Sequence, residues 1–128
     1  MSLNRKKIIN KLIHSPLWNQ QFSFLEITKN TKPSPFGLPI LINKKYLSKN
    51  NKFFNFLKKK GIETRIIMGG NFVNQQSVKI YNLNSKNDNF PKAQEIEDRG
   101  FYIGIHPKPI SNEMLKHLEE NLLKIDKL

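Results

Sequence analysis

The sequence predicts a mixed α/β (α+β) domain in which helices pack over a small three-stranded sheet. Segments with apolar residues at every second position alternate with segments of helical spacing, in the order strand, helix, strand, helix, strand, helix. Glycine, proline and serine residues stand at the expected ends of these segments. Because 128 residues suffice for one modest hydrophobic core, we expect a single globular domain with a segment that leads into it.

The first 35 residues differ in pattern from the rest. Residues 4–14 predict an amphipathic helix that ends before Pro16. A short apolar element at 22–25 and a proline-containing connector at 29–35 (KNTKPSP) follow. The apolar stripe of the helix, which has no obvious partner, consists of Ile8, Ile9, Leu12 and Ile13. We therefore expect residues 1–35 to be a connecting helix and linker, with something missing upstream, and residues 36–128 to be the globular domain.

The globular part begins with a strand and a helix. Apolar residues alternate over 38–42, and Pro39 indicates an edge strand or the start of a strand. Ser48 is the expected N-cap of a helix that continues to residue 60, and Gly61 is the residue expected just past its end. The side chains expected to face inward from this helix are Phe53, Phe54 and Leu57.

The stretch 61–79 contains the candidate site. It begins with a predicted strand whose core side would carry Ile62, Thr64, Ile66 and Met68. Gly69 and Gly70 then permit positive φ or the close approach of a ligand. Neutral hydrogen-bonding side chains follow at once, namely Asn71, Asn74, Gln75 and Gln76. This pattern fits a strand that opens onto a binding site, and it fits equally a turn followed by a solvated polar loop.

The last third predicts two further helices and one strand. Pro91 fits the first turn of a helix over 91–99, which Gly100 ends. Residues 101–106 (FYIGIH) predict the third strand, and the prolines after it break it. Ser111 is the expected N-cap of the final helix, with Glu113 in its first turn. The buried stripe of that helix would consist of Met114, Leu118, Leu122 and Ile125.

The net charge of +12 raises the possibility of a nucleic-acid partner. The charge is uneven, because residues 1–65 hold 14 basic and 2 acidic residues whereas residues 66–128 hold 8 of each. Nearly all the basic residues are lysines, in a chain also rich in asparagine and isoleucine, as expected of AT-rich codons. Base and phosphate recognition relies more on arginine, so nucleic-acid binding is the minority interpretation.

Several site classes lack their sequence signals. Without cysteine there is no disulfide framework, thiolate nucleophile or cysteine-ligated metal site, and no nucleotide, zinc-protease or hydrolase motif occurs. The three histidines lack metal-ligand spacing, so we expect no metal site. No apolar run approaches the roughly 18 residues that cross a bilayer. The basic start is not a convincing signal peptide, and we expect a cytoplasmic protein.

A few charged residues allow two interpretations. Arg65 could hold a phosphate or carboxylate through two hydrogen bonds, or form an ion pair with a helix acid. His106 could pack or donate at the edge of a site, and we favour packing; His117 is expected at the surface. The acids Glu95, Glu97 and Asp98 are typical of a solvated helix face.

Two blocks of the sequence carry a family resemblance. They are KKKGIETRIIMGGNFVNQQSVK and FPKAQEIEDRGFYIGIHPKPIS with the helix that follows. They resemble the C-terminal small domain of the DegT/DnrJ/StrS family of PLP/PMP-dependent sugar-nucleotide aminotransferases. The similarity is greatest to the lipopolysaccharide-synthesis branch typified by CDP-4-keto-6-deoxyglucose 3-dehydrase, and PSPFGLPI resembles the segment that enters the small domain there. The segment 105–109 departs from the dehydrase pattern, which leaves amino transfer and C3 deoxygenation both open.

The resemblance implies an incomplete enzyme. In this family PLP or PMP is bound in a large N-terminal domain, so the resemblance implies no cofactor in this chain, a missing large domain as its partner, and no turnover by the chain alone. It also implies a nucleotide-linked keto-deoxy sugar as substrate. By the same resemblance Arg65 would bind an anionic group, Asn71 and Gln75 would bind sugar hydroxyls, and Gly70 would lie beside them. No catalytic residue is expected in this chain.

Two other classes of protein remain open. A stand-alone basic module would bind nucleic acid through the lysine-rich helix at 49–60. An interaction protein would use the opening helix and the apolar face left bare, which predicts self-association.

Overall fold

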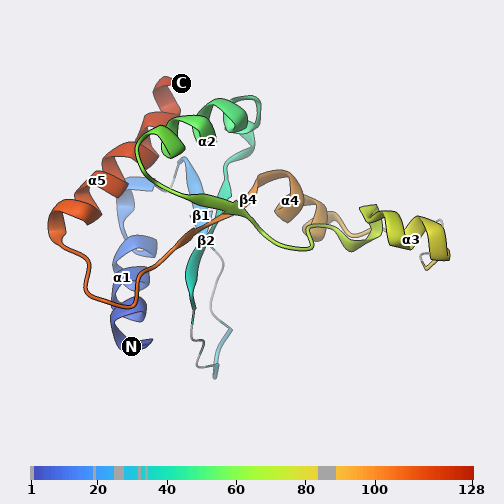
Figure 1. The fold of residues 1–128 in the computed structure, drawn as a ribbon, viewed down its shortest axis with the longest axis horizontal. Helices are drawn as coiled ribbons and strands as arrows, with labels where there is room; N and C mark the ends of the chain where they lie inside the picture. Colours follow the sequence, from blue (N-terminus) through green and yellow to red (C-terminus); the bar gives the residue numbers. More distant parts are fainter. Residues whose placement is uncertain (1, 19, 25–27, 32, 34, 84–88) are drawn as a thin grey trace.

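The computed structural model describes residues 2–18, 20–24, 28–31, 33, 35–83 and 89–128. It contains one antiparallel sheet with the strand order β1-β2-β4-β3 (Figure 1). The strands are β1 (Phe22–Phe24), β2 (Gly37–Ile42), β3 (Thr64–Ile66) and β4 (Gly100–Gly104). The predicted mixed class of helices over a small sheet is confirmed. The three predicted strands correspond to β2, β3 and β4, and β1 was expected only as an apolar element.

The register of the sheet separates its residues into two faces. Leu38 pairs with Ile103, and Ile40 pairs with Phe101, so these four lie on one face, where all are buried. On the other face Pro39 pairs with Tyr102, which in turn pairs with Arg65 of β3. The first face is called the core face below, and the second the open face. The core face belongs to the single hydrophobic core of the described residues.

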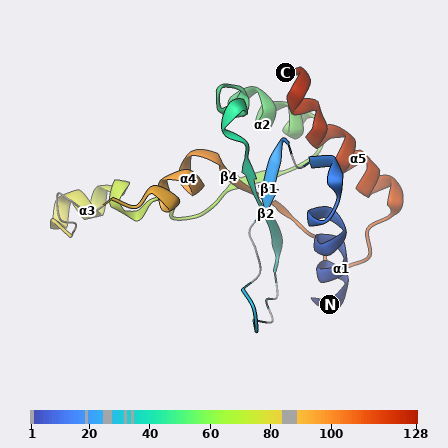
Figure 2. The same cartoon turned by 180° about the vertical axis from the view of Figure 1, so that it is seen from behind.

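Three helices cover the core face. They are α1 (Ser2–Ile13), α2 (Asn50–Lys59) and α5 (Asn112–Leu122), accompanied by the short 3-10 helices η1 (Pro16–Trp18), η2 (Lys44–Lys49) and η4 (Leu123–Lys127). Their inward side chains share one cluster with the sheet, and Figure 2 shows these helices from behind. The amphipathic faces of α2 and α5 are therefore buried on the same side of β2 and β4.

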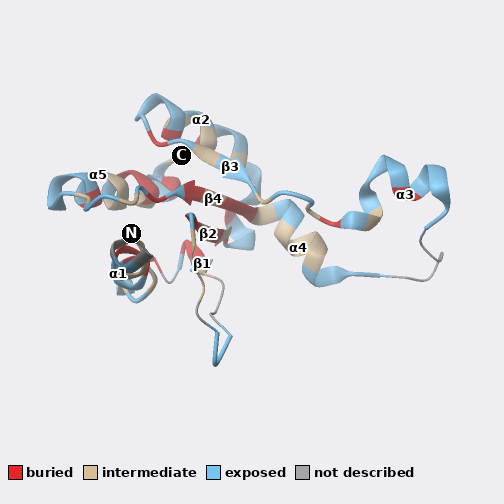
Figure 3. Cartoon of the chain, turned by 60° about the horizontal axis from the view of Figure 1, so that its bottom comes forward, coloured by how far each residue is buried: buried red, intermediate tan, exposed pale blue. Residues whose placement is uncertain are grey.

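The remaining helices lie outside this group. They are η3 (Phe72–Asn74), α3 (Gln76–Tyr81) and α4 (Pro91–Arg99). α4 lies next to the sheet, whereas α3 projects beyond it and is mostly exposed (Figure 3). Residues 69–83 are called the arm below. Val78 is the buried apolar residue of α3, while Ile80, Tyr81 and Leu83 are 65%, 71% and 63% exposed.

The opening helix has a partner after all. Ile9 and Leu12 of α1 are 6% and 1% exposed, within the same core as β2, α2 and α5. Trp18 is 1% exposed, and its indole N–H donates to the backbone oxygen of Leu12 at 2.5 Å. Phe22 then joins the sheet through β1. The packed unit thus crosses the expected boundary at residue 35, and the expectation that the stripe lacks a partner was wrong. That something is missing upstream, and that residues 1–35 connect to another domain, both stay predictions.

The position of Pro39 also differs from the prediction. β2 is a central strand between β1 and β4, so Pro39 is not on an edge strand. The backbone N–H of Ile105 donates to the oxygen of Phe36, and the alternation of an antiparallel ladder then places Pro39 at a non-hydrogen-bonded position facing β4. The missing N–H of proline therefore costs no bond to β4.

The helix ends are mostly as expected. Gly61 has a φ of +75°, as a residue just past a helix end requires, and the Ser111 hydroxyl accepts from the N–H of Met114 at 3.2 Å. Pro91 stands in the first turn of α4, and Gly100 ends it. Ser48 is not an N-cap, because it lies inside η2, whose cap is Asn43, and α2 begins only at Asn50.

Two expected buried stripes are incomplete. Met114 is 61% exposed, and Leu115 occupies the buried position in its place, with Leu122 and Ile125 further along. Ile66 and Met68 are 76% and 85% exposed, although both were expected to face the core. The reason is that β3 is an edge strand only three residues long, after which the chain leaves the sheet for the arm.

The C-terminal segment is held by a carboxylate. Asp126 accepts from the side-chain amide of Gln21 at 2.7 Å and from the hydroxyl of Tyr46. Lys49 donates to the backbone oxygens of Ile125 and Asp126 at 3.3 and 3.1 Å. The hydrogen bonds from Tyr46 and Gln21 lower the pKa of Asp126, since they stabilise its ionised form. This carboxylate therefore joins η4 to η2 and to the turn before β1.

None of the described helices is long and apolar enough to cross a membrane.

Substitution of Leu12 tests whether α1 belongs to the core. Leu12→Ala should lower the free energy of unfolding by roughly 2 to 5 kcal/mol, because it leaves a cavity where the side chain is 1% exposed. Leu3→Ala on the same helix, at a side chain 71% exposed, is the matched control and should change little. Urea titration measures both. Equal, small effects would show that α1 is not packed as described.

The pH dependence of the Asp126→Asn variant tests whether the ionised carboxylate of Asp126 holds the C-terminal segment in place. Because the folded-state pKa of Asp126 lies below its usual 3.8, its stabilising effect is present above pH 3.8 and disappears as the pH falls through the folded-state pKa. Asp126→Asn should therefore lower the melting temperature at neutral pH, and its difference from the wild type should shrink below pH 3.8. A difference that is independent of pH would contradict the role of the ionised carboxylate.

Candidate functional site

The paired glycines form a tight turn at the end of β3. Gly69 and Gly70 have φ values of +87° and +47°, in the left-handed region that favours glycine. The N–H of Gly70 donates to the oxygen of Ile67 at 3.4 Å, which closes the turn. A Cβ atom on Gly70 would lie 2.9 Å from Oε2 of Glu97, so α4 packs directly against this glycine. The turn thus reverses the chain away from the sheet and starts the arm.

Three of the four predicted site residues lie together at this turn. Asn71 is 5% exposed; its N–H donates to Glu97 Oε2 at 2.5 Å, and its side-chain Nδ2 donates to Gln94 Oε1 at 3.0 Å. Gln75 is exposed, and its Nε2 donates back to the oxygen of Gly69 at 3.2 Å. Gly70 directly precedes Asn71 in the chain. The structure therefore joins Gly70, Asn71 and Gln75 into one polar group at the base of the arm.

The acids of α4 are more engaged than a solvated face implies. Glu97 and Asp98 are exposed, but Glu97 accepts from Asn71 and Asp98 accepts from Gln94. Glu95 pairs with Lys44 at 2.9 Å and with Arg99 at 3.3 Å. The hydrogen bond from Lys44, followed by its charge, lowers the pKa of Glu95. The acidic run therefore connects α4 on one side to the arm and on the other to η2.

Arg65 lies apart from this turn, on the open face of β3. Its Nε and Nη2 atoms donate to Glu63 Oε1 at 3.1 and 2.9 Å. Both side chains are largely exposed, and the hydrogen bond and charge of Glu63 raise the pKa of Arg65. The partner is thus the residue just before β3 and not the helix acid considered from the sequence. Beside Arg65, Tyr102 packs edge-on against Phe36 with ring centres 5.4 Å apart.

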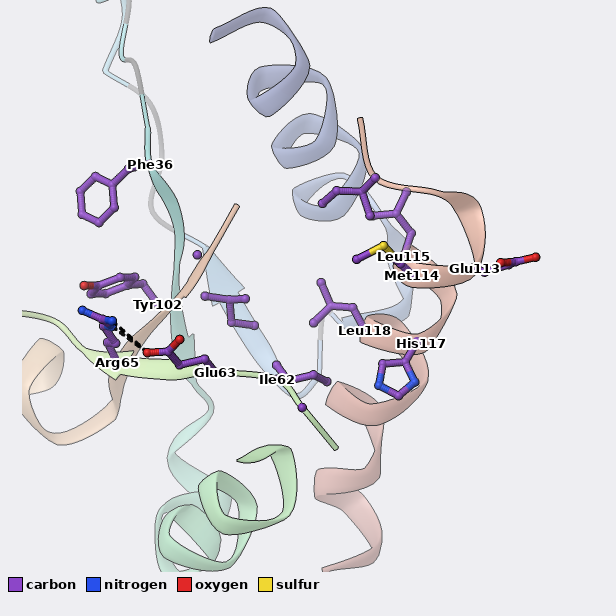
Figure 4. Close-up of a pocket in the computed structure, with 14 residues that line it drawn as sticks. Phe36, Ile62, Glu63, Arg65, Tyr102, Glu113, Met114, Leu115, His117 and Leu118 are labelled. Carbon is purple, nitrogen blue, oxygen red and sulfur yellow. Dashed lines mark hydrogen bonds and ion pairs between the residues drawn. The ribbon is translucent and has the colours of Figure 1, made fainter. Parts of the chain in front are cut away.

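Arg65 stands at the mouth of a groove of about 700 Å³ between the sheet and α5 (Figure 4). Ile62, Ile103 and Leu115 give the groove apolar walls, and its remaining lining includes Phe36, Glu63, Tyr102, Met114 and Leu118. His117 of α5 lies opposite, exposed as expected, with Nε2 3.0 Å from the backbone oxygen of Lys60. The groove therefore combines an apolar interior with an ion pair at one side of its mouth.

A second apolar groove, of about 370 Å³, crosses the open face. Its lining is Pro35, Phe36, Gly37, Pro39, Ile67, Met68 and Tyr102. Phe36 and Tyr102 line both grooves, and sequence reasoning missed them as site residues. The alternation of FYIGIH contained the signal for Tyr102, because it puts this residue on the face opposite Phe101 and Ile103. Neither groove is lined by Gly70, Asn71 or Gln75, so Arg65 and the glycine turn do not share a pocket.

His106 does not pack in the core. Its side chain is exposed, and Nδ1 accepts from the N–H of Lys108 at 3.1 Å, which stabilises the turn after β4. It is outside the lining of both grooves. The preference for packing was therefore wrong.

The linings of the two apolar grooves do not fit a pyridoxal phosphate site. Such a site requires a lysine amine for the Schiff base or a residue in its place, within a pocket that also holds the phosphate. The residues that line the two apolar grooves include no lysine, and Arg65 at the larger one is engaged with Glu63. No group of three metal-ligating side chains occurs in the described part of the chain. These grooves are suited to apolar contact and to an anion at Arg65.

Comparison with known proteins gives the family. The sequence profile of the DegT/DnrJ/EryC1/StrS aminotransferase family matches residues 1–122. No curated protein matches the chain in sequence.

Solved structures share the fold. A GDP-4-keto-6-deoxymannose-3-dehydratase with a trapped PLP-glutamate geminal diamine superposes with a TM-score of 0.73 at 24% identity, over 94% of this chain and 30% of that one. The Escherichia coli GDP-4-keto-6-deoxy-D-mannose-3-dehydratase with hydrated PLP gives 0.73 at 23% identity, over 94% and 29%. A Streptococcus pneumoniae protein assigned as a sugar aminotransferase, in its PLP form, gives 0.76 at 20% identity, over 99% and 31%.

These comparisons define what is shared and what is not. At these identities the structural likeness concerns the fold, and the chain spans about 30% of the length of each solved relative. The match of the family profile covers nearly the whole sequence. This chain belongs to the DegT/DnrJ/EryC1/StrS aminotransferase family.

Proposed function

We propose that this chain is the C-terminal part of a PLP- or PMP-dependent enzyme that acts on a nucleotide-linked keto-deoxy sugar. The reaction would be amino transfer or C3 dehydration with deoxygenation, in lipopolysaccharide or O-antigen sugar synthesis. The observation that carries the proposal is an open sheet face with an exposed arginine in a chain of the aminotransferase family. The solved proteins of the same fold include sugar dehydratases and a protein assigned as a sugar aminotransferase.

The open face supports a large cofactor-binding domain as the partner. Phe36 and Met68 are 63% and 85% exposed, and together with Pro39 and Tyr102 they line an apolar groove. An exposed apolar surface of this kind is typical of an interface. The solved relatives are more than three times as long as this chain, and their remaining length is the material that would cover the face. The substrate would then lie between the open face and that domain.

Arg65 is the proposed anchor for an anionic group of the substrate. Its ion pair with Glu63 is largely exposed, and such pairs contribute little because water competes with both partners. A phosphate or carboxylate can therefore replace Glu63 as the partner at small cost. The planar guanidinium would then bind two oxygens of the anion side by side, which gives direction as well as charge.

The glycine turn is proposed to bind the sugar. Gln75 is exposed, and since its Nε2 is used by Gly69, its carbonyl Oε1 is the group that can accept from a hydroxyl. Gly70 gives the turn its positive φ, and the absence of a side chain lets Glu97 pack beside it. Asn71 is mostly buried, so it would act mainly by holding the turn and would contact the sugar only through its small exposed surface.

The chemistry itself would come from the missing part. When bound, the cofactor supplies the electron sink for reaction next to the sugar carbonyl. This chain would orient the nucleotide sugar through Arg65 and the glycine turn and would exclude water with the open face. We therefore expect no turnover by the isolated chain.

Substitutions in the complete enzyme test the site residues. Arg65→Ala and Asn71→Ala should each reduce kcat/KM for the nucleotide sugar by the equivalent of roughly 1 to 3 kcal/mol, which is about 5- to 150-fold. Lys79→Ala, on the exposed side of α3, is the control and should leave kcat/KM unchanged. Steady-state kinetics measures all three. Wild-type values for Arg65→Ala and Asn71→Ala would remove both residues from the site.

The isolated chain tests whether the open face is an interaction surface. With no covering domain, its exposed apolar side chains should cause weak self-association, which sedimentation velocity detects as a mass that rises with concentration. Glu substitutions at Phe36 and Met68 together should abolish the rise, whereas Leu3→Glu, at a side chain 71% exposed on α1, should not. A mass independent of concentration, or equal effects of the two changes, would contradict this use of the face.

A further inference from the structure

We propose that Gln94 and Glu97 of α4 are positioning residues that make the glycine turn a hydrogen-bond acceptor for sugar hydroxyls. This inference rests on the proposed function, because it concerns how the same turn would meet its substrate. The two side chains stand three residues apart and therefore lie on one side of the helix. Both bond to the start of the arm.

Glu97 fixes where the turn lies. One carboxylate oxygen accepts from the backbone N–H of Asn71 at 2.5 Å, and both oxygens accept from Asn74 Nδ2 at 3.2 Å. The same carboxylate fills the space beside Gly70, since a Cβ there would lie 2.9 Å from Oε2 and 3.1 Å from Cγ. A charged acceptor on a backbone N–H makes a stronger bond than a neutral one. The position of the turn relative to α4 thus depends on this side chain.

Gln94 fixes which way the amide of Asn71 points. The carboxylate of Asp98 can only accept, so the NH₂ group of Gln94 faces it, with Nε2 and Oδ1 2.8 Å apart. The carbonyl of Gln94 must then face the arm, where it accepts from Nδ2 of Asn71 at 3.0 Å and from Nδ2 of Asn74 at 2.8 Å. Asn71 consequently presents its NH₂ group to α4 and directs Oδ1 away from Gln94.

The same direction holds for the exposed amide of the turn. Gln75 Nε2 donates to the backbone oxygen of Gly69, so the carbonyl oxygen of this amide is directed away from that bond. Each of these two amides uses one of its two N–H groups within the protein, and its carbonyl oxygen is left as an acceptor. Such a site favours hydroxyl groups, which donate, over phosphate or carboxylate oxygens, which only accept. The turn would therefore select the sugar, and Arg65, in a separate groove, would select the anionic part.

The test compares two probes on the complete enzyme. GDP-4-keto-6-deoxymannose and CDP-4-keto-6-deoxyglucose are first assayed as substrates. The nucleoside diphosphate that corresponds to the reactive substrate, GDP or CDP, is then measured as an inhibitor. Glu97→Ala should raise KM for the nucleotide sugar roughly tenfold with little change in kcat, because one charge-assisted bond to the turn is lost. The inhibition constant of the nucleoside diphosphate, which lacks the sugar, should stay within about twofold. Glu97→Gln retains an acceptor and should recover most of the loss.

A matched variant on the same helix is the control. Glu95→Gln removes a carboxylate that pairs with Lys44 and Arg99 and does not touch the turn, so it should leave KM unchanged. Equal losses for the nucleotide sugar and the nucleoside diphosphate would overturn the inference, because general damage to the fold would explain them. If Glu97→Ala has the wild-type KM while Asn71→Ala and Gln75→Ala raise KM, the positioning role of Glu97 is overturned. The glycine turn would then remain a substrate-binding site. Wild-type KM in all three would remove the turn from the site altogether.

Discussion

The antiparallel ladder between β2 and β4 is the interaction on which the rest of the structure depends. Gly37 to Leu41 pair with Gly100 to Gly104. β1 and β3 add to its two edges, and the core face of the ladder collects α1, α2 and α5. Because side chains alternate along a strand, the residues that build the core also fix which residues point outward. Phe101 and Ile103 are buried, so Tyr102 between them must lie on the open face.

The two proposed functional regions follow from this ladder in different ways. The position of Arg65 is set directly by the sheet, because Arg65 of the edge strand β3 pairs with Tyr102 of β4 on the open face. The glycine turn gains its place indirectly, through α4, whose last residue precedes β4 in the chain. The hydrogen bonds of Gln94 and Glu97 hold the turn against α4, and α4 is itself joined directly to β4. A small sheet can thus orient an exposed arm with few buried apolar contacts of its own.

The sequence was a good guide where structure is set locally. Gly61, Pro91 and Ser111 marked helix ends, because positive φ, a fixed φ and a capping hydroxyl act within one turn of the chain. The sequence failed where long-range packing decides. β1 is three residues long and exists only because it pairs with β2, and the stripe of α1 found its partner in a core formed by distant strands. The exposure of Ile66 and the hydrogen bond from Asn71 to Glu97 also depend on residues distant in the chain, so the sequence did not predict them. The polar residues at 71–75 are adjacent in the chain, and the sequence did predict that group.

The central claim is that this chain works as the smaller part of a cofactor-dependent enzyme. The coding DNA on the 5′ side of the Met1 codon tests it most directly. The account predicts an open frame of roughly 250 to 300 further residues, the size of one large domain, with a lysine or histidine suited to the cofactor site. An in-frame stop close to Met1, with no cofactor-binding domain encoded nearby, would contradict the account and favour a stand-alone module.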